Sequence, residues 1–334
     1  MSRESLVARV LAFQDGALQG RPPESFDTLA RDLHAWQVAH DPVIASLVEG
    51  PVTTWSQIPA VPVDVFKQLR VGTVKDDNGV LFRTSGTTQG VRGVHRMRAT
   101  EAYDHGAVLW AKRFLPDMPG RIVALLDDPR RATDSSLSHM VGLFSDDASW
   151  HVTDGRVDTD AAHAAVRASD APVFLCATAF ALAIWLEGEV PRLPDGSLVM
   201  VTGGFKGRVV RLSDDDLYAD AMTRLGPKRI VTEYGMTELS SQMWGSPEDA
   251  YRPPPWLKAL AVDPESGAPL EPGTPGQLRF FDLANIDGSL AIETLDEGVV
   301  LGDGAVRLRG RLTGAPARGC SLTVEDGWVG EDAP

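Results

Sequence analysis

The chain has 334 residues, which is enough for one large domain or two medium domains with a full hydrophobic core. Its hydrophobic content of 43% is normal for a globular protein, and no stretch approaches the roughly 20 apolar residues of a membrane span. The net charge of −14 argues against non-specific binding to nucleic acid or to a membrane surface. Any anionic ligand must therefore be held by a local site, because the overall field repels it.

The small number of cysteines and the sequence of the first residues bear on the cellular compartment of the protein. The two cysteines, Cys176 and Cys320, do not make a disulfide framework. The chain also begins without the apolar run of a secretion signal. We therefore expect a reducing, cytoplasmic setting.

Residues 1–50 predict two amphipathic helices separated by residues 20–23, and residues 51–70 predict an extended segment that contains prolines. Residues 80–82 predict a short strand before a glycine-rich loop. Beyond the loop, apolar runs of strand length alternate with segments of helix length. The predicted strands are residues 122–126, 173–176, 198–201 and 229–231, and the predicted helices are residues 99–114, 178–187 and 213–225.

Strands that alternate with helices predict a layered α/β fold with a largely parallel sheet. From about residue 255 the pattern changes to Pro, Gly and short alternating strands, which predicts a smaller β-rich region. We therefore expect four segments. They are an amino-terminal helical and extended segment that packs on the core (1–70), an α/β core (71–254), a β-rich subdomain (255–311) and a short tail (312–334) that carries Cys320.

The loop of residues 84–93 is rich in hydroxyl residues and glycines. Thr84 and Ser85 precede Gly86, and Thr87 and Thr88 follow it. Backbone N–H groups and hydroxyls in such a loop can surround a phosphate group, although the spacing is not that of a P-loop. The alternative is an ordinary surface turn, and the hydroxyls on both sides of Gly86 favour the phosphate loop.

Residues 233–238, Glu-Tyr-Gly-Met-Thr-Glu, directly follow a predicted strand. Ligand sites in open α/β sheets lie beyond the carboxyl ends of strands, and a glutamate at such a place can hold Mg²⁺ against phosphate oxygens. Glu238 is therefore a candidate metal ligand. The alternative is a turn between strand and helix, in which Thr237 or Glu238 caps the helix.

A third motif consists of Gly302-Asp303 and the basic residues 307–311. An aspartate after a glycine turn can accept hydrogen bonds from both ribose hydroxyls. The arginines that follow can neutralise phosphate, or they can make surface ion pairs.

In this order the three motifs resemble those of the adenylate-forming superfamily of acyl-CoA synthetases, luciferases and peptide-synthetase adenylation domains. Gly302-Asp303 resembles its ribose-binding aspartate, and Gly310-Arg311 resembles its hinge motif. The resemblance implies ATP and Mg²⁺ as cofactors, attack of a carboxylate on the α-phosphate, and acyl-AMP and pyrophosphate as products. The ATP-binding residues that it implies are Thr84, Ser85, Gly86, Thr87, Thr88, Gly203, Gly204, Phe205, Tyr234, Gly235, Thr237, Asp303 and Arg311, with Glu238 at the metal.

Two departures narrow the resemblance. The superfamily's phosphate loop usually ends in Pro-Lys-Gly, whereas residues 91–93 read Val-Arg-Gly. The superfamily also has a mobile C-terminal domain with a catalytic lysine near its end, whereas only residues 312–334 follow Arg311 and none of them is lysine. We therefore expect layered α/β sheets like those of the superfamily's N-terminal domain, with the mobile C-terminal domain essentially absent.

This shortened form resembles the LuxE-type acyl-protein synthetases, relatives of the phenylacetate-CoA ligases, over nearly the whole chain. Residues 58–62, 135–140 and 202–207 contribute to the resemblance. Members of that family carry their acyl group on a cysteine close to the C-terminus, and Cys320 stands at that place. A thiolate suits this role, because a thioester retains much of the energy of acyl-AMP for a later step. Cys176 lies in an apolar strand and is expected to be a buried core cysteine.

Three further side chains are candidates with open alternatives. Lys206 is expected to stabilise charge at the α-phosphate in place of the missing lysine, or else to be a turn lysine that faces solvent. His139 is expected to close the carboxylate pocket, or else to be a helix-capping or core histidine. His95 is a weaker candidate for a phosphate contact.

The predicted protein is thus an AMP-forming acid–thiol ligase of the acyl-protein synthetase kind. It would activate a carboxylic acid, transfer the acyl group to Cys320, and pass it to a partner protein such as an acyl reductase. One alternative is transfer to coenzyme A, a carrier protein or an amine, and another is a degenerate nucleotide-binding scaffold protein. Neither nucleic acid nor membrane is expected as a partner, and the identity of the acid stays open.

Overall fold

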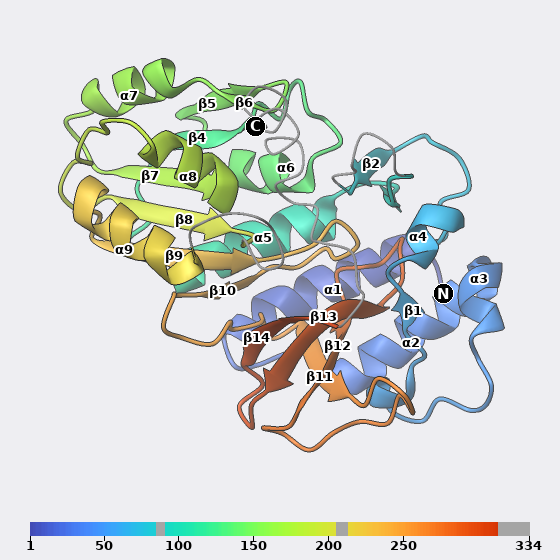
Figure 1. The fold of residues 1–334 in the computed structure, drawn as a ribbon. Helices are drawn as coiled ribbons and strands as arrows, with labels where there is room; N and C mark the ends of the chain where they lie inside the picture. Colours follow the sequence, from blue (N-terminus) through green and yellow to red (C-terminus); the bar gives the residue numbers. More distant parts are fainter. Residues whose placement is uncertain (85–90, 205–212, 313–334) are drawn as a thin grey trace.

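The computed structural model describes residues 1–84, 91–204 and 213–312. Figure 1 shows two lobes. The upper lobe is a seven-stranded sheet with helices on both faces, and the lower lobe is a five-stranded sheet that packs against the amino-terminal helices. This arrangement confirms the predicted α/β fold with several sheets.

The amino-terminal segment forms the back of the lower lobe. Its elements are α1 (Arg3–Leu18), α2 (Phe26–His40), α3 (Pro42–Ser46), the short 3₁₀ helix η1 (Trp55–Gln57), β1 (Val61–Pro62) and α4 (Val65–Gln68). The first two are the predicted amphipathic helices. Each begins after a serine, Ser2 or Ser25, whose side chain accepts a hydrogen bond from a backbone N–H of the first turn.

The seven-stranded sheet has the order β10-β9-β8-β7-β4-β5-β6, and its five middle strands are parallel. Its strands are β4 (Arg121–Asp127), β5 (Ala148–Thr153), β6 (Arg156–Val157), β7 (Val173–Thr178), β8 (Leu198–Thr202), β9 (Arg229–Tyr234) and β10 (Met243–Gly245). Its helices are α5 (Glu101–Phe114), α6 (Ser136–Gly142), α7 (Thr159–Arg167), α8 (Ala179–Leu186) and α9 (Asp214–Leu225). The predicted strands and helices of this region are confirmed.

Side chains of β4 alternate between the two covered faces of this sheet. Val123 and Leu125 pack with α7, α8 and α9, whereas Ile122 and Leu126 pack with α5 and α6. Burial on both faces explains why the strand is a continuous apolar run in the sequence. Cys176 of β7 is fully buried, as expected, and burial raises the pKa of its thiol.

The five-stranded sheet joins segments from the two ends of the chain. It has the order β1-β13-β12-β11, with β14 paired to β13, and β1 is parallel to β13. The other strands are β11 (Leu257–Val262), β12 (Pro275–Asp282), β13 (Ala291–Val300) and β14 (Val306–Arg311). Leu6 of α1 and Leu33 of α2 share a hydrophobic cluster with Trp256 and Phe281, so residues 1–70 and 255–311 pack together.

A short antiparallel hairpin lies between the two lobes (Figure 1). It consists of β2 (Val80–Arg83) and β3 (Val94–Met97). Phe82 and Met97 anchor it in the cluster beneath α5. The hairpin carries the predicted phosphate loop at its tip.

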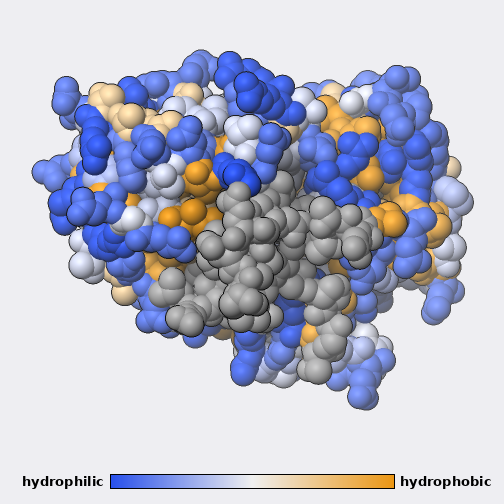
Figure 2. Space-filling view, turned by 45° about the horizontal axis from the view of Figure 1, so that its top comes forward, coloured by the Kyte–Doolittle hydropathy of each residue, from blue (hydrophilic) through white to orange (hydrophobic). Residues whose placement is uncertain are grey.

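Figure 2 shows that one face of the molecule is mainly hydrophilic, with hydrophobic residues in separate patches. The large hydrophobic side chains that are exposed within the described ranges are Met1, Leu69, Val91 and Met222. Within the same ranges, no helix is long and apolar enough to span a membrane.

Candidate active site

Two cavities lie beside the carboxyl ends of the parallel strands, as expected for a sheet of this topology. Cavity A, of about 420 Å³, is lined by the ends of β4, β5, β7, β8 and β9 and by the start of α6. Cavity B, of about 460 Å³, is lined by Gly203 and Gly204, the start of α9, and residues of β9, β13 and β14. Both volumes are typical of small-molecule sites.

Glu233, near the end of β9, lines both cavities and marks the boundary between them. It is almost fully buried, and the Thr202 hydroxyl donates a hydrogen bond of 2.6 Å to its carboxylate. A side chain on Gly235 would bring its Cβ to within 2.5 Å of the Glu233 Oε1 atom. The boundary therefore requires glycine at that position. Glu233 is not among the site residues predicted from the sequence.

The hairpin packs against the motif of residues 233–238 at Thr237 and Glu238, beside cavity A. The ring Nδ1 of His95 lies 2.8 Å from the carbonyl oxygen of Thr237. A Cβ added to Gly93 would lie 3.3 Å from the Glu238 Oε1 atom and 3.2 Å from the Thr84 side chain. Two motifs that are far apart in the sequence thus come together, and Thr84 faces Glu238 across a glycine.

The base of the loop is closed by hydrogen bonds from Thr84. Its hydroxyl accepts from the Gly93 N–H at 2.9 Å, and its own N–H donates to the Gly93 carbonyl at 3.0 Å. Arg92, the residue in place of the usual lysine, donates to the Thr84 carbonyl and forms an ion pair with Asp134 at 2.9 Å. Its guanidinium therefore supports the base of the loop.

Glu238 is 3% exposed. Burial raises the pKa of its carboxyl to about 7, and the charge of Lys67 opposes this shift. Its backbone carbonyl accepts a hydrogen bond from the Asn285 amide at 2.8 Å. A buried carboxylate beside a phosphate loop fits Mg²⁺, which proteins bind through one or two carboxylates together with substrate phosphates.

Asp296 and Arg311 line cavity B, and Tyr234 contacts Asp296 without itself being among the described lining residues. The Tyr234 hydroxyl donates to the Asp296 carboxylate at 2.8 Å, and the Arg311 guanidinium lies 3.4 Å from the same carboxylate. Tyr234 and Asp296 are almost fully buried. The structure therefore brings the predicted Tyr234 and Arg311 together, with Asp296 between them.

Asp303, the predicted ribose ligand, lies elsewhere. It occupies the turn between β13 and β14, where its carboxylate caps the Ala305 N–H and pairs with Arg252 at 3.0 Å. Its side chain is 55% exposed, and it is not among the described residues that line the two cavities. The buried acid at this side of the lower sheet is Asp296. The inward alternation of Ile292, Thr294 and Asp296 along β13 is the signal that could have identified it.

Gly203 and Gly204 line cavity B together with Thr232 of β9. Gly203 has a φ of 76°, which favours glycine. The Thr232 hydroxyl is buried and has no hydrogen-bond partner among the described residues. A buried hydroxyl without a partner on a cavity wall fits a polar ligand, because it can bond to that ligand at little further cost of desolvation.

His139 of α6 points toward α5. Its Nε2 lies 2.7 Å from the Asp104 carboxylate, and its ring packs between Phe82 and Tyr103. Neighbouring residues of α6 line cavity A, whereas His139 is not among the described lining residues. The structure therefore does not bring His139 to the other predicted side chains.

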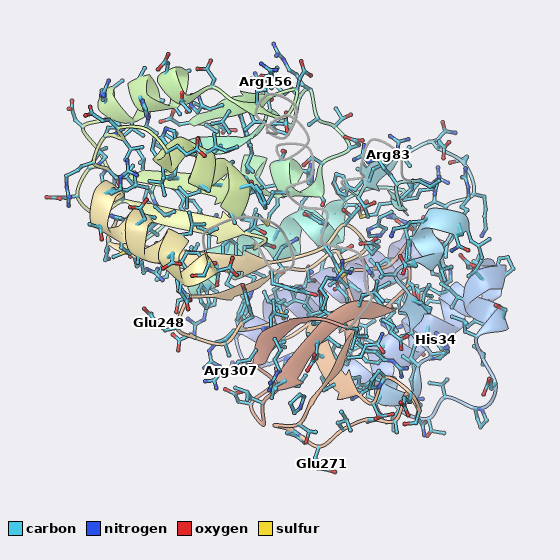
Figure 3. All side chains as sticks on the ribbon, viewed as in Figure 1. His34, Arg83, Arg156, Glu248, Glu271 and Arg307 are labelled. Carbon is cyan, nitrogen blue, oxygen red and sulfur yellow. The ribbon has the colours of Figure 1, made fainter. Side chains whose placement is uncertain are left out.

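The His95 ring lies against the Thr237 carbonyl. It is 1% exposed, and burial lowers its pKa. Figure 3 shows Arg83 at the end of β2, where it lines cavity A. Seven predicted site residues lie outside the described ranges, namely Ser85, Gly86, Thr87, Thr88, Phe205, Lys206 and Cys320.

The chain is similar to one named enzyme over most of its length. It is 23% identical over 301 residues to the long-chain-fatty-acid–luciferin-component ligase of Vibrio harveyi, a match that covers 83% of this chain and 80% of that protein. No family model matches the chain. The similarity agrees with the predicted resemblance to LuxE-type acyl-protein synthetases.

Solved structures share the fold. The O-succinylbenzoate coenzyme A synthetase MenE of Bacillus subtilis, in complex with ATP and magnesium ion, matches with a TM-score of 0.51 and 17% identity over 71% of this chain. ATP-bound MatB of Rhodopseudomonas palustris matches with a TM-score of 0.50 and 16% identity over 69% of this chain. The matches span 52% and 47% of those two proteins, or about half of their length. They confirm the predicted fold class, and their bound ligands are those expected from the motifs.

Proposed function

We propose that this chain is an AMP-forming acid–thiol ligase that activates a carboxylic acid with ATP. The contact between the hairpin and residues 233–238 carries the proposal, because it brings the base of the predicted phosphate loop to the buried Glu238, next to Thr237 in the wall of cavity A. One cavity can hold the nucleotide and the other the acid. The similarity to a named ligase and the fold shared with ATP-bound synthetases support the same function.

In this proposal cavity B holds the nucleoside. Gly203 and Gly204 flank the adenine, together with Phe205. Asp296, held by Tyr234, accepts the ribose hydroxyls in place of Asp303, because a buried carboxylate with a fixed orientation is the better acceptor of paired hydroxyls.

The phosphates lie at the tip of the hairpin, at the base of the loop. Thr84 and the loop hydroxyls of Ser85, Thr87 and Thr88 bind them, and Gly235 and Thr237 face them from the end of β9. Glu238 holds Mg²⁺, which neutralises phosphate charge when bound. The carboxylate of the acid, in cavity A, attacks the α-phosphate in line with the departing pyrophosphate, and correct positioning supplies much of the rate.

A cation is needed where the acid meets the α-phosphate, because the buried Glu233 already places negative charge there. Lys206, two residues beyond Gly204, is our candidate. Replacement of Lys206 by alanine is expected to slow acyl-AMP formation more than about tenfold. A smaller effect in a pyrophosphate-exchange assay would count against this role.

For the second half-reaction, Cys320 attacks the carbonyl carbon of acyl-AMP, the bond to AMP breaks, and a thioester forms. The acyl group then passes to a partner such as an acyl reductase. Cys320→Ser should abolish covalent labelling by radioactive acid and ATP, yet leave pyrophosphate exchange intact. Labelling that survives the substitution would favour direct transfer to coenzyme A, a carrier protein or an amine.

The first half-reaction is tested by ATP–pyrophosphate exchange over a panel of acids. Exchange that depends on both an added acid and Mg²⁺ is the expected result. It would also eliminate the degenerate scaffold protein. Tight ATP binding without exchange for any acid would contradict the proposed function.

A further inference from the structure

Cavity A is a trough along the carboxyl edge of the seven-stranded sheet. Its lining residues come from the ends of β9, β8, β7, β4 and β5, which are neighbours in that order. Because neighbouring strands lie about 4.8 Å apart, the trough extends over roughly 19 Å. One end lies at Gly235 and Thr237, beside the proposed phosphate site, and the other lies at Asp154, in the turn between β5 and β6.

The chemical character of the trough changes along its length. Its middle strands, β8 and β7, contribute the hydroxyl side chains of Thr202 and Thr178. Its far end contains Leu125 and Leu126 of β4, and the carboxylates of Asp127, at the end of β4, and Asp154. An acid whose carboxylate lies at Thr237 would therefore extend past the two threonines and place its remote end beside the two carboxylates.

These two carboxylates differ from Asp128 and Asp134, which line the same trough. Asp128 forms an ion pair with Arg130 at 2.6 Å. Asp134 forms ion pairs with Arg92 at 2.9 Å and with Arg83 at 3.8 Å. Among residues 1–84, 91–204 and 213–312, no arginine, lysine or histidine forms an ion pair with Asp127 or Asp154. Burial, and after it the charge of Asp154, raises the pKa of the Asp127 carboxyl, as expected for a partly buried acid beside a second acid.

The backbone holds Asp154 in place. Asp154 and Gly155 have φ values of 51° and 76°, and Thr153 pairs with Arg156 across them. Positive φ at both central residues is characteristic of a type I′ turn, the tight connection of a two-residue hairpin. The far end of the trough is therefore fixed by β4 and by this turn.

An alkyl chain at the far end would remove water from Asp127 and Asp154 without offering a hydrogen bond, which is unfavourable. A cationic group there would gain charge-assisted hydrogen bonds instead. We infer that the acid activated by this chain carries an amine or guanidinium at the end remote from its carboxylate, and that Asp127 selects it. This inference rests on the proposed function, since it takes cavity A as the site of the acid.

The test measures kcat/KM in ATP–pyrophosphate exchange for 6-aminohexanoate, 8-aminooctanoate, hexanoate, octanoate and tetradecanoate. The kcat/KM of each ω-amino acid is expected to exceed that of the alkanoic acid of equal length by about tenfold or more, because one charged hydrogen bond contributes a free energy of that size. Asp127→Asn should bring this ratio close to one. An equal or greater rate with the alkanoic acids would overturn the inference while the proposed function stands.

Two controls separate the possible failures. Asp195→Asn removes one negative charge from an exposed loop before β8, and it should keep the preference for amino acids. If it also lost the preference, the net charge of the protein and not Asp127 would set the selectivity. Absence of exchange with every acid, in protein that still binds ATP, would overturn the proposed function together with this inference.

Discussion

Cavities A and B share strand β9, yet their carboxylates are in opposite situations. In cavity B, Asp296 accepts from Tyr234 and lies beside Arg311. In cavity A, Asp127 and Asp154 form no ion pair with a described cation. If cavity B holds the nucleotide and cavity A the acid, as proposed, the nucleotide side is organised before its ligand binds, whereas the acid side leaves charge for its ligand to neutralise.

The largest expected effect concerns Glu238, where the hairpin meets β9. Glu238→Gln keeps the shape of the side chain but removes the charge that binds the metal. Pyrophosphate exchange should fall by about 100-fold or more, as for the loss of a main electrostatic contact. Added Mg²⁺ should not restore the rate. Full activity at ordinary Mg²⁺ would show that the metal is held elsewhere.

The next effect compares two aspartates at either end of the β13–β14 region. Asp296→Asn should raise the KM for ATP by about tenfold or more, since a charged hydrogen bond is lost. The KM for the acid should not change, because Asp296 lies in cavity B. Asp303→Asn is the matched control and should change the KM for ATP less than about twofold, as befits an exposed ion pair. If Asp303→Asn raised the KM for ATP more than Asp296→Asn does, Asp303 and not Asp296 would be the ribose ligand.

A smaller effect, on the free energy of unfolding, concerns the buried hydrogen bonds that hold the residues after β9. Asp282 is fully buried, and it accepts hydrogen bonds from the Ser240 N–H at 2.9 Å and the Ser241 hydroxyl at 2.7 Å. Burial raises the pKa of its carboxyl to about 6, although these donors oppose the shift.

Because this folded-state pKa exceeds the unfolded value of about 4, the folded state binds the proton more tightly, and the free energy of unfolding should fall as the pH rises from about 4 to about 6. The change from this group is up to roughly 3 kcal/mol. Asp282→Asn should lose that part of the pH dependence in urea unfolding. A variant with the same pH slope as the parent protein would contradict the raised pKa.

The smallest effect concerns the base of the loop. Thr84→Ala removes the acceptor of the Gly93 N–H but keeps the backbone bond to Gly93. The exchange rate should fall by roughly two- to tenfold, in line with one neutral hydrogen bond. Thr84→Ser retains the hydroxyl and should recover most of the rate. If serine were no better than alanine, the methyl group of Thr84 rather than its hydroxyl would matter.

The sequence predicts the sheet of the upper lobe well because its strands are buried on both faces. Residues 122–126 and 173–176 are continuous apolar runs for that reason. Helices α6 and α7 were not predicted. Both are short, and α6 is rich in serine and glycine, so propensity alone does not reveal it.

The candidate site was predictable where a motif is local and not where it depends on distant packing. Gly235, Met236 and Thr237 are adjacent in the chain, and all three line cavity A. The choice between Asp303 and Asp296 depends instead on how β13 packs against Tyr234, and an aspartate in a glycine turn forms the stronger local pattern. The sequence did not indicate a role for Asp127. Asp127 and Asp154 come together only because β4 pairs with β5, which the turn at Asp154 connects to β6.

The hydrogen bonds behind the loop after β9 couple the two lobes. Asn285 donates to the Glu238 carbonyl at 2.8 Å, and the Gln37 side chain of α2 donates to the Asn285 carbonyl at 2.8 Å. Glu238, the proposed metal ligand, is therefore tied to the lower lobe, although it follows a strand of the upper one. Damage to the distant amino-terminal helix would reach the proposed metal site through two side-chain amides, so α2 supports that site from the far side of the lower lobe.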